Sequence, residues 1–174
     1  MNYEYGCRLR NHEKRQTDMK LLVVSDTHGN EQCLRQAIEQ QPAARMVLHL
    51  GDGAREAQTV AGDTPDKPFY IVRGNCDWGQ TLPEVGLIEV SGRRIFYTHG
   101  YRYQVKAGIY TAVCAAREQK ADILLFGHTH EPFTEYEDGL YILNPGSLAY
   151  GRATYGLIEI TPSGIMTNIV PLRR

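Results

Sequence analysis

The sequence predicts a layered α/β fold in a single domain. Short apolar runs of strand length recur along the chain, and helical stretches separate the earlier ones. The earlier runs are apolar at nearly every position, as in strands buried on both faces, whereas the later runs alternate more and lie closer together. The first half is therefore β-α-β and the second half is rich in successive strands, which indicates layered α/β architecture.

The expected strands are runs of β-branched and aliphatic residues. They cover residues 21–24, 46–50, 69–72, 95–98, 123–126, 140–143 and 157–160. Asn30 is a candidate N-cap for a helix over residues 31–41, in which Leu34 and Ala37 share one face. A second helix is expected over residues 103–119, and a short third one over residues 55–61.

Length and composition favour one soluble domain. No linker interrupts residues 19–174, which we predict to form that domain. Residues 1–18 are polar and mix both charge signs, so we expect a disordered N-terminal extension. The longest apolar runs are far shorter than the roughly 20 residues of a membrane helix, so no membrane partner is expected.

Charge and cysteine usage indicate a cytoplasmic protein with a small partner. The 19 basic and 20 acidic residues are spread along the chain, which argues against the basic stripe that binds duplex nucleic acid. The four cysteines lie far apart without a C-x-x-C pair, so neither a disulfide framework nor a structural zinc site is expected.

Metal-binding side chains follow five of the apolar runs. The expected ligands are two carboxylates, one amide and four histidines: Asp26, His28, Asp52, Asn75, His99, His128 and His130. Because ligands bind at the carboxyl ends of parallel strands, these side chains are expected to converge on one pocket. They are too many for one tetrahedral ion and suit two ions that share a carboxylate.

Single histidines are weak indicators of a metal site. One histidine after a strand is more often a hydrogen-bonded core or surface residue than a ligand, so the prediction depends on the ordered combination of all five segments. His49 lies inside its apolar run and is expected to pack behind the ligands. Gly51, Gly74 and Gly127 precede ligands, and their missing Cβ lets the backbone approach closely.

The same segments resemble a known family. SDTHGN, HLGD, RGNCD, THG and GHTH, in this order, resemble the five blocks of the calcineurin-like metallophosphoesterases. GNCD in a short chain, with NPGS at residues 144–147, resembles the YfcE-type phosphodiesterase subgroup. The resemblance implies a four-layer αββα sandwich, in which two mixed β-sheets are flanked by helices and the metals lie at the sheet edge.

The resemblance also implies roles for the side chains. Asp26, His28 and His130 would bind a first ion, Asn75, His99 and His128 a second, and Asp52 would bridge both. Manganese is favoured, with nickel, iron and zinc as alternatives, because mixed imidazole and carboxylate ligands suit several first-row ions. A hydroxide bridging the two ions is expected to attack the phosphoester, and the expected catalytic residues are Asp52, Asn75, Cys76 and Asp77.

Cys76 departs from the family pattern. A cysteine-nucleophile phosphatase requires an arginine after a five-residue loop, but Leu82 occupies that position. Many metallophosphoesterases have a histidine in place of Cys76, thought to protonate the departing oxygen. Cations lower a thiol's pKa, and a thiolate donates no proton. Cys76 either lies beside the second ion in an enzyme that prefers good leaving groups, or is a small buried filler.

The expected function is metal-dependent hydrolysis of a small or exposed phosphodiester. One alternative is a phosphomonoesterase. Another is an interaction scaffold, because the small subunit of retromer shares this fold while its ligand set is eroded. Here every ligand position is filled, which favours an enzyme, although fold alone never decides function. The sequence is also compatible with a homo-oligomer.

Overall fold

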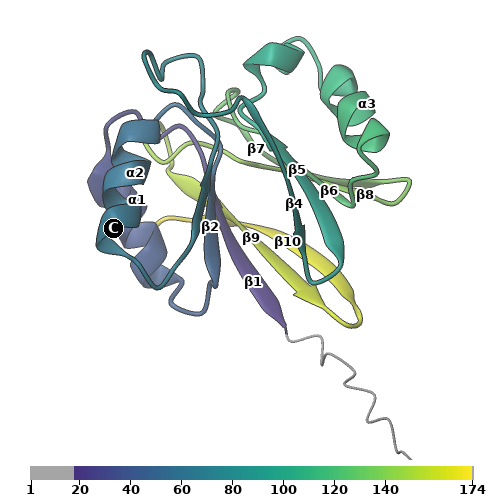
Figure 1. The fold of residues 1–174 in the computed structure, drawn as a ribbon, viewed down its shortest axis with the longest axis horizontal. Helices are drawn as coiled ribbons and strands as arrows, with labels where there is room; N and C mark the ends of the chain where they lie inside the picture. The colour runs from purple at the N-terminus through teal and green to yellow at the C-terminus, as the bar shows by residue number, and fades with distance from the viewer. Residues whose placement is uncertain (1–17, 174) are drawn as a thin grey trace, which may run out of the picture.

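The computed structural model describes residues 18–173 and contains two five-stranded β-sheets packed face to face (Figure 1). Helices α1 and α2 lie on the outside of one sheet and α3 lies on the outside of the other (Figure 1). The predicted four-layer αββα sandwich is confirmed. The expectation for residues 1–18 concerns a segment that, apart from Asp18, lies outside the described residues.

The first sheet has the strand order β10-β9-β1-β2-β3. Its strands are β1 (Met19–Val24), β2 (Met46–His49), β3 (Phe69–Ile71), β9 (Thr154–Thr161) and β10 (Gly164–Pro171). The strands β1, β2 and β3 run parallel, whereas β9 and β10 are antiparallel additions. The connections between the parallel strands are α1 (Glu31–Gln40) and α2 (Ala54–Asp63), so the predicted β-α-β pattern is confirmed.

The second sheet has the strand order β4-β5-β6-β8-β7. Its strands are β4 (Val85–Val90), β5 (Arg93–Thr98), β6 (Ile123–Leu125), β7 (Pro132–Glu137) and β8 (Leu140–Pro145). The strands β5, β6 and β8 are parallel, and the antiparallel strands β4 and β7 form the two edges. A 3-10 turn, η1 (Tyr101–Tyr103), and the helix α3 (Tyr110–Glu118) connect β5 to β6.

Three apolar layers separate the four layers of secondary structure. Leu21 and Val23 of β1 face the other sheet, whereas Leu22 and Val24 face the helices, as the two-residue period of a strand requires. A third cluster joins α3 to the second sheet around Phe96. Each inner strand is therefore covered on both faces, which explains why the early runs are continuously apolar.

Several expected boundaries were wrong. The predicted helix over residues 103–119 begins only at Tyr110, because Gly108 has a φ of 147° and interrupts the segment between η1 and α3. Helix α2 is longer than the expected residues 55–61. The strands β4, β7 and β10 were not predicted: all are edge strands with half-exposed or exposed positions, and β7 is exposed throughout.

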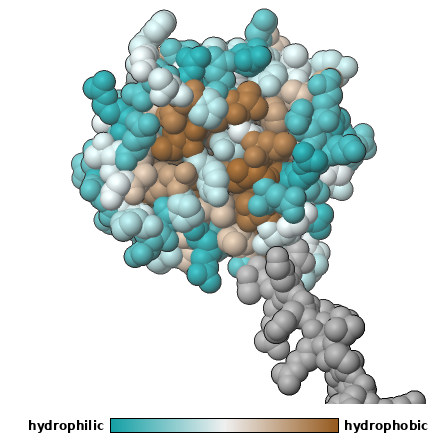
Figure 2. All heavy atoms as spheres, in the orientation of Figure 1, coloured by the Kyte–Doolittle hydropathy of each residue, from teal (hydrophilic) through white to brown (hydrophobic). Residues whose placement is uncertain are grey.

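The outer surface carries both apolar and hydrophilic side chains. Figure 2 shows apolar side chains gathered near the middle of the face seen in Figure 1, with hydrophilic side chains around them. No helix in residues 18–173 combines the length and the apolar character that crossing a membrane requires.

The predicted N-cap gives a test of the local fold. The Asn30 side chain accepts a hydrogen bond from the Cys33 amide at 3.1 Å, so the Asn30→Ala variant is expected to lose about 1 kcal/mol of unfolding free energy. Thermal unfolding of the metal-free protein should shift down by about 2–4 °C. The exposed Gln32→Ala in the same helix is the control, and equal shifts in both variants would contradict the capping role.

Candidate metal centre

The structure brings the predicted ligand side chains together at one edge of the two sheets. Asp26 and His28 follow β1, Asp52 follows β2, Asn75 follows β3, His99 follows β5, and His128 and His130 follow β6. The loops after these five strands face one another because both sheets present their parallel carboxyl ends on the same side. The predicted convergence on one pocket is therefore found in the structure.

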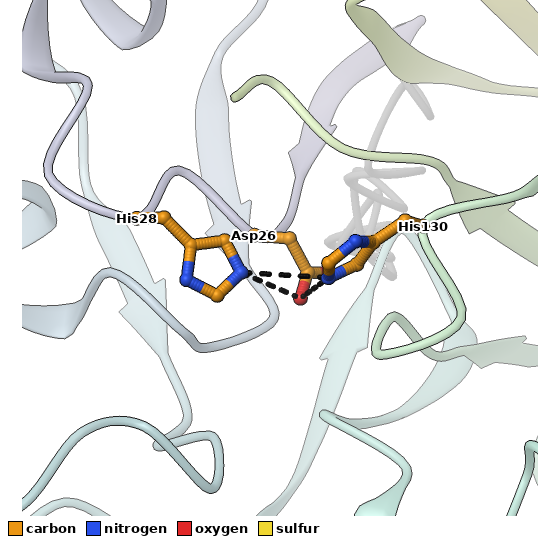
Figure 3. Close-up of side chains that lie close together, drawn as sticks. All are labelled: Asp26, His28 and His130. Carbon is orange, nitrogen blue, oxygen red and sulfur yellow. Dashed lines mark hydrogen bonds and ion pairs between the residues drawn. The ribbon is translucent and has the colours of Figure 1, made fainter. Parts of the chain in front are cut away.

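A first group of ligand atoms consists of Asp26, His28 and His130. The Asp26 Oδ1 atom lies 3.1 Å from His130 Nε2 and 3.7 Å from His28 Nε2, and these two nitrogens are 3.4 Å apart. Figure 3 shows the two imidazole rings converging on the carboxylate from opposite sides. All three atoms could contact one small cation.

A second group surrounds His99. Its Nε2 atom lies 3.1 Å from Asn75 Oδ1, 3.1 Å from His128 Nδ1 and 3.4 Å from Asp52 Oδ2. The same Asp52 oxygen lies 3.9 Å from His28 Nε2 in the first group. Asp52 therefore lies between the two groups, as a ligand shared by two ions would.

One buried carboxylate oxygen lacks a hydrogen-bond partner within residues 18–173. Asp26 is fully buried, and its Oδ2 accepts hydrogen bonds from Ser25 Oγ at 2.5 Å and from the His128 amide at 3.1 Å. Its Oδ1 has no hydrogen-bond donor among residues 18–173. A buried carboxylate oxygen without a donor is costly unless a cation compensates it. This oxygen, and the mixture of imidazole and carboxylate donors, fit a divalent metal ion.

The protonation states also suit metal binding. Burial raises the pKa of Asp26 and of Asp52, but the close contact of His28 with Asp26 and of His99 with Asp52, together with the positive charge of the imidazoles, lowers both pKa values below the usual range. Burial, with the nearby His99 charge, lowers the pKa of His128 to about 4. Both carboxyl groups are thus ionised and His128 is neutral at neutral pH, which is the state in which they coordinate metals.

The ligand residues have an unusual backbone conformation. Five of them lie in the left-handed region: Asp26 (φ 55°), His28 (42°), Asp52 (54°), His128 (69°) and His130 (62°). Non-glycine residues rarely adopt positive φ, although Asp and His tolerate it better than most. Strain of this kind concentrates at functional sites, where the surrounding structure enforces it. The loops therefore hold their ligands in a conformation that the isolated segments would not favour.

Two of the predicted glycines fit tightly against ligand side chains. A Cβ atom on Gly74 would lie 2.1 Å from Asp52 Oδ1, and one on Gly127 would lie 2.0 Å from Ser25 Oγ. Both distances are too short for any side chain. The glycines therefore make room for the carboxylates as well as for a bound ion.

Asp77 joins the loop that carries Asp52 to the loop that carries Asn75. Its Oδ2 accepts hydrogen bonds from the amides of Asp52 (2.8 Å) and Gly74 (2.7 Å), and its Oδ1 accepts from Gly53 (2.9 Å) and Ala54 (2.8 Å). Ala54 begins α2, so the carboxylate also compensates the helix N-terminus. These contacts favour a positioning role for Asp77 over direct contact with a substrate.

His49 packs behind the ligands, as predicted. It is fully buried, its Nδ1 accepts a hydrogen bond from the Gly51 amide at 3.2 Å, and its Nε2 lies 3.0 Å from Thr27 Oγ1. Because burial lowers the pKa of His49 to about 4, the ring is neutral and its one proton lies on Nε2, donated to Thr27. His49 therefore connects the loop of Asp26 to the loop of Asp52 through hydrogen bonds.

Two supporting glutamates were not predicted. Glu56 of α2 accepts hydrogen bonds from Thr27 Oγ1 (2.8 Å) and from the Gly29 amide (2.5 Å), on either side of His28. Glu84 binds Arg73, at 2.5 Å, and the Tyr101 hydroxyl, so it links the Asn75 loop to the turn after His99. Neither glutamate belongs to a recognisable motif, and an isolated acidic residue in sequence is indistinguishable from a solvated one.

Cys76 differs from both earlier interpretations. Its thiol is exposed, so the interpretation as a buried filler is wrong. Its Sγ lies within 4.8 Å of ligand atoms of His28 and Asp52 and 3.3 Å from Asn75 Nδ2, so it adjoins the shared carboxylate and the first group rather than the second group alone. Burial, then the hydrogen bond with Asp52, raises its pKa to about 11, which keeps the thiol protonated in the metal-free protein.

The ligand groups open into a cavity of about 550 Å³. His28, Asp52, Cys76, Trp78 and Tyr150 are among its lining residues. A larger cavity, of about 730 Å³, lies between β4 and η1 and contains none of the predicted ligands. The cavity of about 550 Å³ is therefore the one that contains His28 and Asp52.

The fold and this centre together define a metallophosphoesterase, and comparison with known proteins agrees. Residues 19–162 match the calcineurin-like phosphoesterase superfamily domain, so the chain belongs to that family. The chain is 31% identical over 135 residues to the probable metallophosphoesterase YsnB of Bacillus subtilis, covering 77% of this chain and 78% of YsnB. It is 29% identical over 176 residues to phosphodiesterase YfcE of Escherichia coli, covering 81% and 88% of the two chains.

A solved structure supports the same fold. A conserved protein from Streptococcus pneumoniae, described as a predicted phosphoesterase, superposes with a TM-score of 0.78 at 25% sequence identity. The match covers 89% of this chain and 90% of that one. The members of the family are hydrolases that use divalent metals, which agrees with the candidate ligand groups.

Asp77 gives a test of how the site is held together. The Asp77→Asn variant replaces one acceptor oxygen with an amide donor, so at least one backbone amide loses its partner. The expected loss is about 1–3 kcal/mol of unfolding free energy. Metal affinity should fall roughly 10- to 100-fold, as for other groups that orient ligands. Chemical denaturation and calorimetric metal titration measure the two effects.

The exposed Asp66→Asn is the matched control and is expected to change neither quantity. Unchanged metal affinity in Asp77→Asn, despite lower stability, would show that Asp77 supports only the fold.

Proposed function

We propose that this protein hydrolyses a small or exposed phosphodiester with the help of two divalent metal ions. Manganese is the favoured metal. The observation that carries the proposal is the position of the buried Asp52 carboxylate. Its Oδ2 lies 3.4 Å from His99 Nε2 and 3.9 Å from His28 Nε2, between two otherwise separate ligand groups. The name of the relative YfcE supports the preference for a diester.

The ligand assignment follows the two groups. Asp26, His28 and His130 would hold the first ion, Asn75, His99 and His128 the second, and Asp52 would contact both. When bound, the ions would supply Lewis acidity, which would lower the pKa of a water molecule to give a hydroxide nucleophile and would neutralise charge on the phosphoryl oxygens. Breaking of the ester P–O bond then releases an alcohol that takes up a proton.

Cys76 holds the shared carboxylate in place and offers only a weak proton donor. The Cys76 amide donates to Asp52 Oδ1 at 2.7 Å, which fixes the carboxylate while leaving Oδ2 for ligand contacts. The Cys76 thiol, whose pKa is raised to about 11, is a much weaker proton donor than an imidazolium. We therefore propose that the enzyme favours esters whose leaving group needs little protonation, such as aryl diesters.

A cytoplasmic location is part of the same proposal. Cys33, Cys76 and Cys114 are free thiols, and residues 18–173 contain no disulfide, as expected in a reducing compartment. The oligomeric state stays a prediction.

Metal reconstitution tests the activity. The metal-stripped protein should be inactive, and adding manganese, nickel, iron or zinc singly should restore hydrolysis of bis-p-nitrophenyl phosphate more than that of p-nitrophenyl phosphate. In the manganese-loaded protein, Asp52→Asn should lower kcat/KM on the order of 10³-fold, because a charged ligand shared by both groups is lost. Asp66→Asn is the control.

Faster hydrolysis of the monoester would favour a phosphomonoesterase. No hydrolysis of either ester with any ion, together with a biological phenotype that survives Asp52→Asn, would favour the interaction scaffold.

Replacing Cys76 tests the role of the leaving group. In Cys76→His, an imidazole can protonate the departing oxygen, so hydrolysis of diesters with alkyl leaving groups should rise more than hydrolysis of aryl diesters. A plot of log kcat/KM against leaving-group pKa should become flatter. Cys76→Ser is the control of similar size and should not flatten the plot. Equal acceleration of both substrate types by Cys76→His would contradict the proposed role.

A further inference from the structure

Trp78 is the sole tryptophan of the chain and is 87% exposed. Such exposure is unusual, because tryptophan has a large apolar surface and is highly buried on average. Its backbone is nevertheless well fixed. The Trp78 amide donates to the Cys76 carbonyl at 3.0 Å, and the preceding Asp77 is held by four backbone amides. The indole is therefore presented from a rigid turn beside the ligand loops.

Trp78 lines two cavities that adjoin the proposed metal centre. The cavity of about 550 Å³ contains His28, Asp52 and Trp78, and a smaller one of about 220 Å³ contains Asn75, Tyr101 and Trp78. A diester has two substituents on its phosphorus. The indole thus lies where a substituent would extend from a phosphoester bound at Asp52.

A second aromatic ring lies in the larger cavity. The Tyr150 ring stacks on His130, with ring centroids 5.2 Å apart and an interplanar angle of 17°, and its centroid is 5.0 Å from that of His28. Tyr150 is 55% exposed, so part of its ring remains available. Ligand sites typically combine aromatic walls with a few polar groups in a volume of this size.

The same cavity contains a cation without a protein partner. The Arg55 guanidinium, at the start of α2, makes no ion pair or hydrogen bond within residues 18–173. A free guanidinium beside the carboxylate-rich centre suits an anionic phosphate, and the aromatic side chains suit a flat apolar group. A substrate that satisfies both is a phosphoester carrying an aromatic ring.

We propose that Trp78 is a stacking platform for a planar aromatic group of the substrate, a nucleobase or an aryl ring, in the cavity that it shares with Tyr150 and Arg55. The proposal rests on the proposed phosphodiesterase function and specifies its substrate class. Aromatic stacking accepts any flat ring and is worth roughly 5- to 150-fold in affinity. A substrate with only aliphatic substituents would gain none of this.

Tryptophan fluorescence, excited at a wavelength that tyrosine does not absorb, tests binding directly, because Trp78 is the sole tryptophan of the chain. The zinc-loaded protein is titrated with AMP, phenyl phosphate and ribose 5-phosphate, zinc being chosen because it is not paramagnetic. AMP should quench the emission saturably, and ribose 5-phosphate should cause little change. Quenching by phenyl phosphate as strong as by AMP would identify an aryl ring as sufficient. Equal changes with AMP and ribose 5-phosphate, or none with AMP, would overturn the proposal.

Kinetics test the same idea through a specificity ratio. Thymidine 5′-(p-nitrophenyl phosphate) and methyl p-nitrophenyl phosphate share a leaving group and differ in the retained substituent. Trp78→Ala should lower kcat/KM for the thymidine ester about tenfold or more relative to the methyl ester, mainly through KM, and Trp78→Phe should restore much of the ratio. Tyr110→Ala removes an exposed aromatic ring on α3 and should leave both substrates unaffected.

The two measurements separate the two proposals. Equal loss for both esters in Trp78→Ala would mean structural damage and would overturn the stacking role. If neither ester is hydrolysed, the proposed function fails, while saturable quenching by AMP would still establish an aromatic binding site at Trp78.

Discussion

The burial of two carboxylates at one sheet edge is the constraint on which the site depends. Asp26 and Asp52 are almost fully buried, and each uses one oxygen for hydrogen bonds from the protein. The remaining oxygens face imidazole nitrogens between 3.1 and 3.9 Å away. Ionised carboxylates are tolerated in such a place only when positive charge lies close to them. Three histidines, His28, His99 and His130, converge on these oxygens from both sheets.

Backbone hydrogen bonds hold this arrangement against its own strain. The left-handed backbone conformation of five ligand residues has a free-energy cost, which contacts within each loop do not offset. Asp77 offsets it with four amide contacts that span two loops, and Glu56 with two contacts around His28. Each acceptor joins segments that lie more than twenty residues apart in sequence. The geometry of the ligands is thus a property of the whole sheet edge.

This dependence explains what the sequence could and could not predict. The convergence of the candidate ligands was predictable because each follows a strand, and the carboxyl ends of parallel strands meet. The edge strands β4, β7 and β10 lack the continuous apolar runs by which the inner strands were recognised, because polar residues such as Glu89, Glu135 and Asn168 interrupt them. Glu56 and Glu84 act through contacts distant in sequence, which no local pattern encodes. Cys76 was predicted to be significant, but its exposure and neighbours required coordinates.

Protons and metal ions act as alternatives at this centre. The pKa values of His28 and His99 are raised, His28 first by its close contact with Asp26 and His99 by Asp52 against the opposing effect of burial. Stability from these imidazolium–carboxylate contacts is fully present below the unfolded histidine value of 6.5 and is lost as pH rises through the folded pKa.

The carboxyl groups behave in the opposite sense. Their lowered pKa values contribute stability above the unfolded value of 3.8, which is lost as pH falls through the folded pKa. The contacts of Asp26 and Asp52 with His28 and His99 are therefore strongest in the mildly acidic range between these two values, whereas the lowered pKa values of His49 and His128 oppose stability in that range. As the pH rises through the folded pKa values of His28 and His99, these two imidazoles become neutral. The loss of their protons leaves Asp26 and Asp52 uncompensated, and it also frees the imidazole nitrogens to bind a metal ion. In the proposed metal-bound state, the charge that compensates Asp26 and Asp52 would be that of the cation.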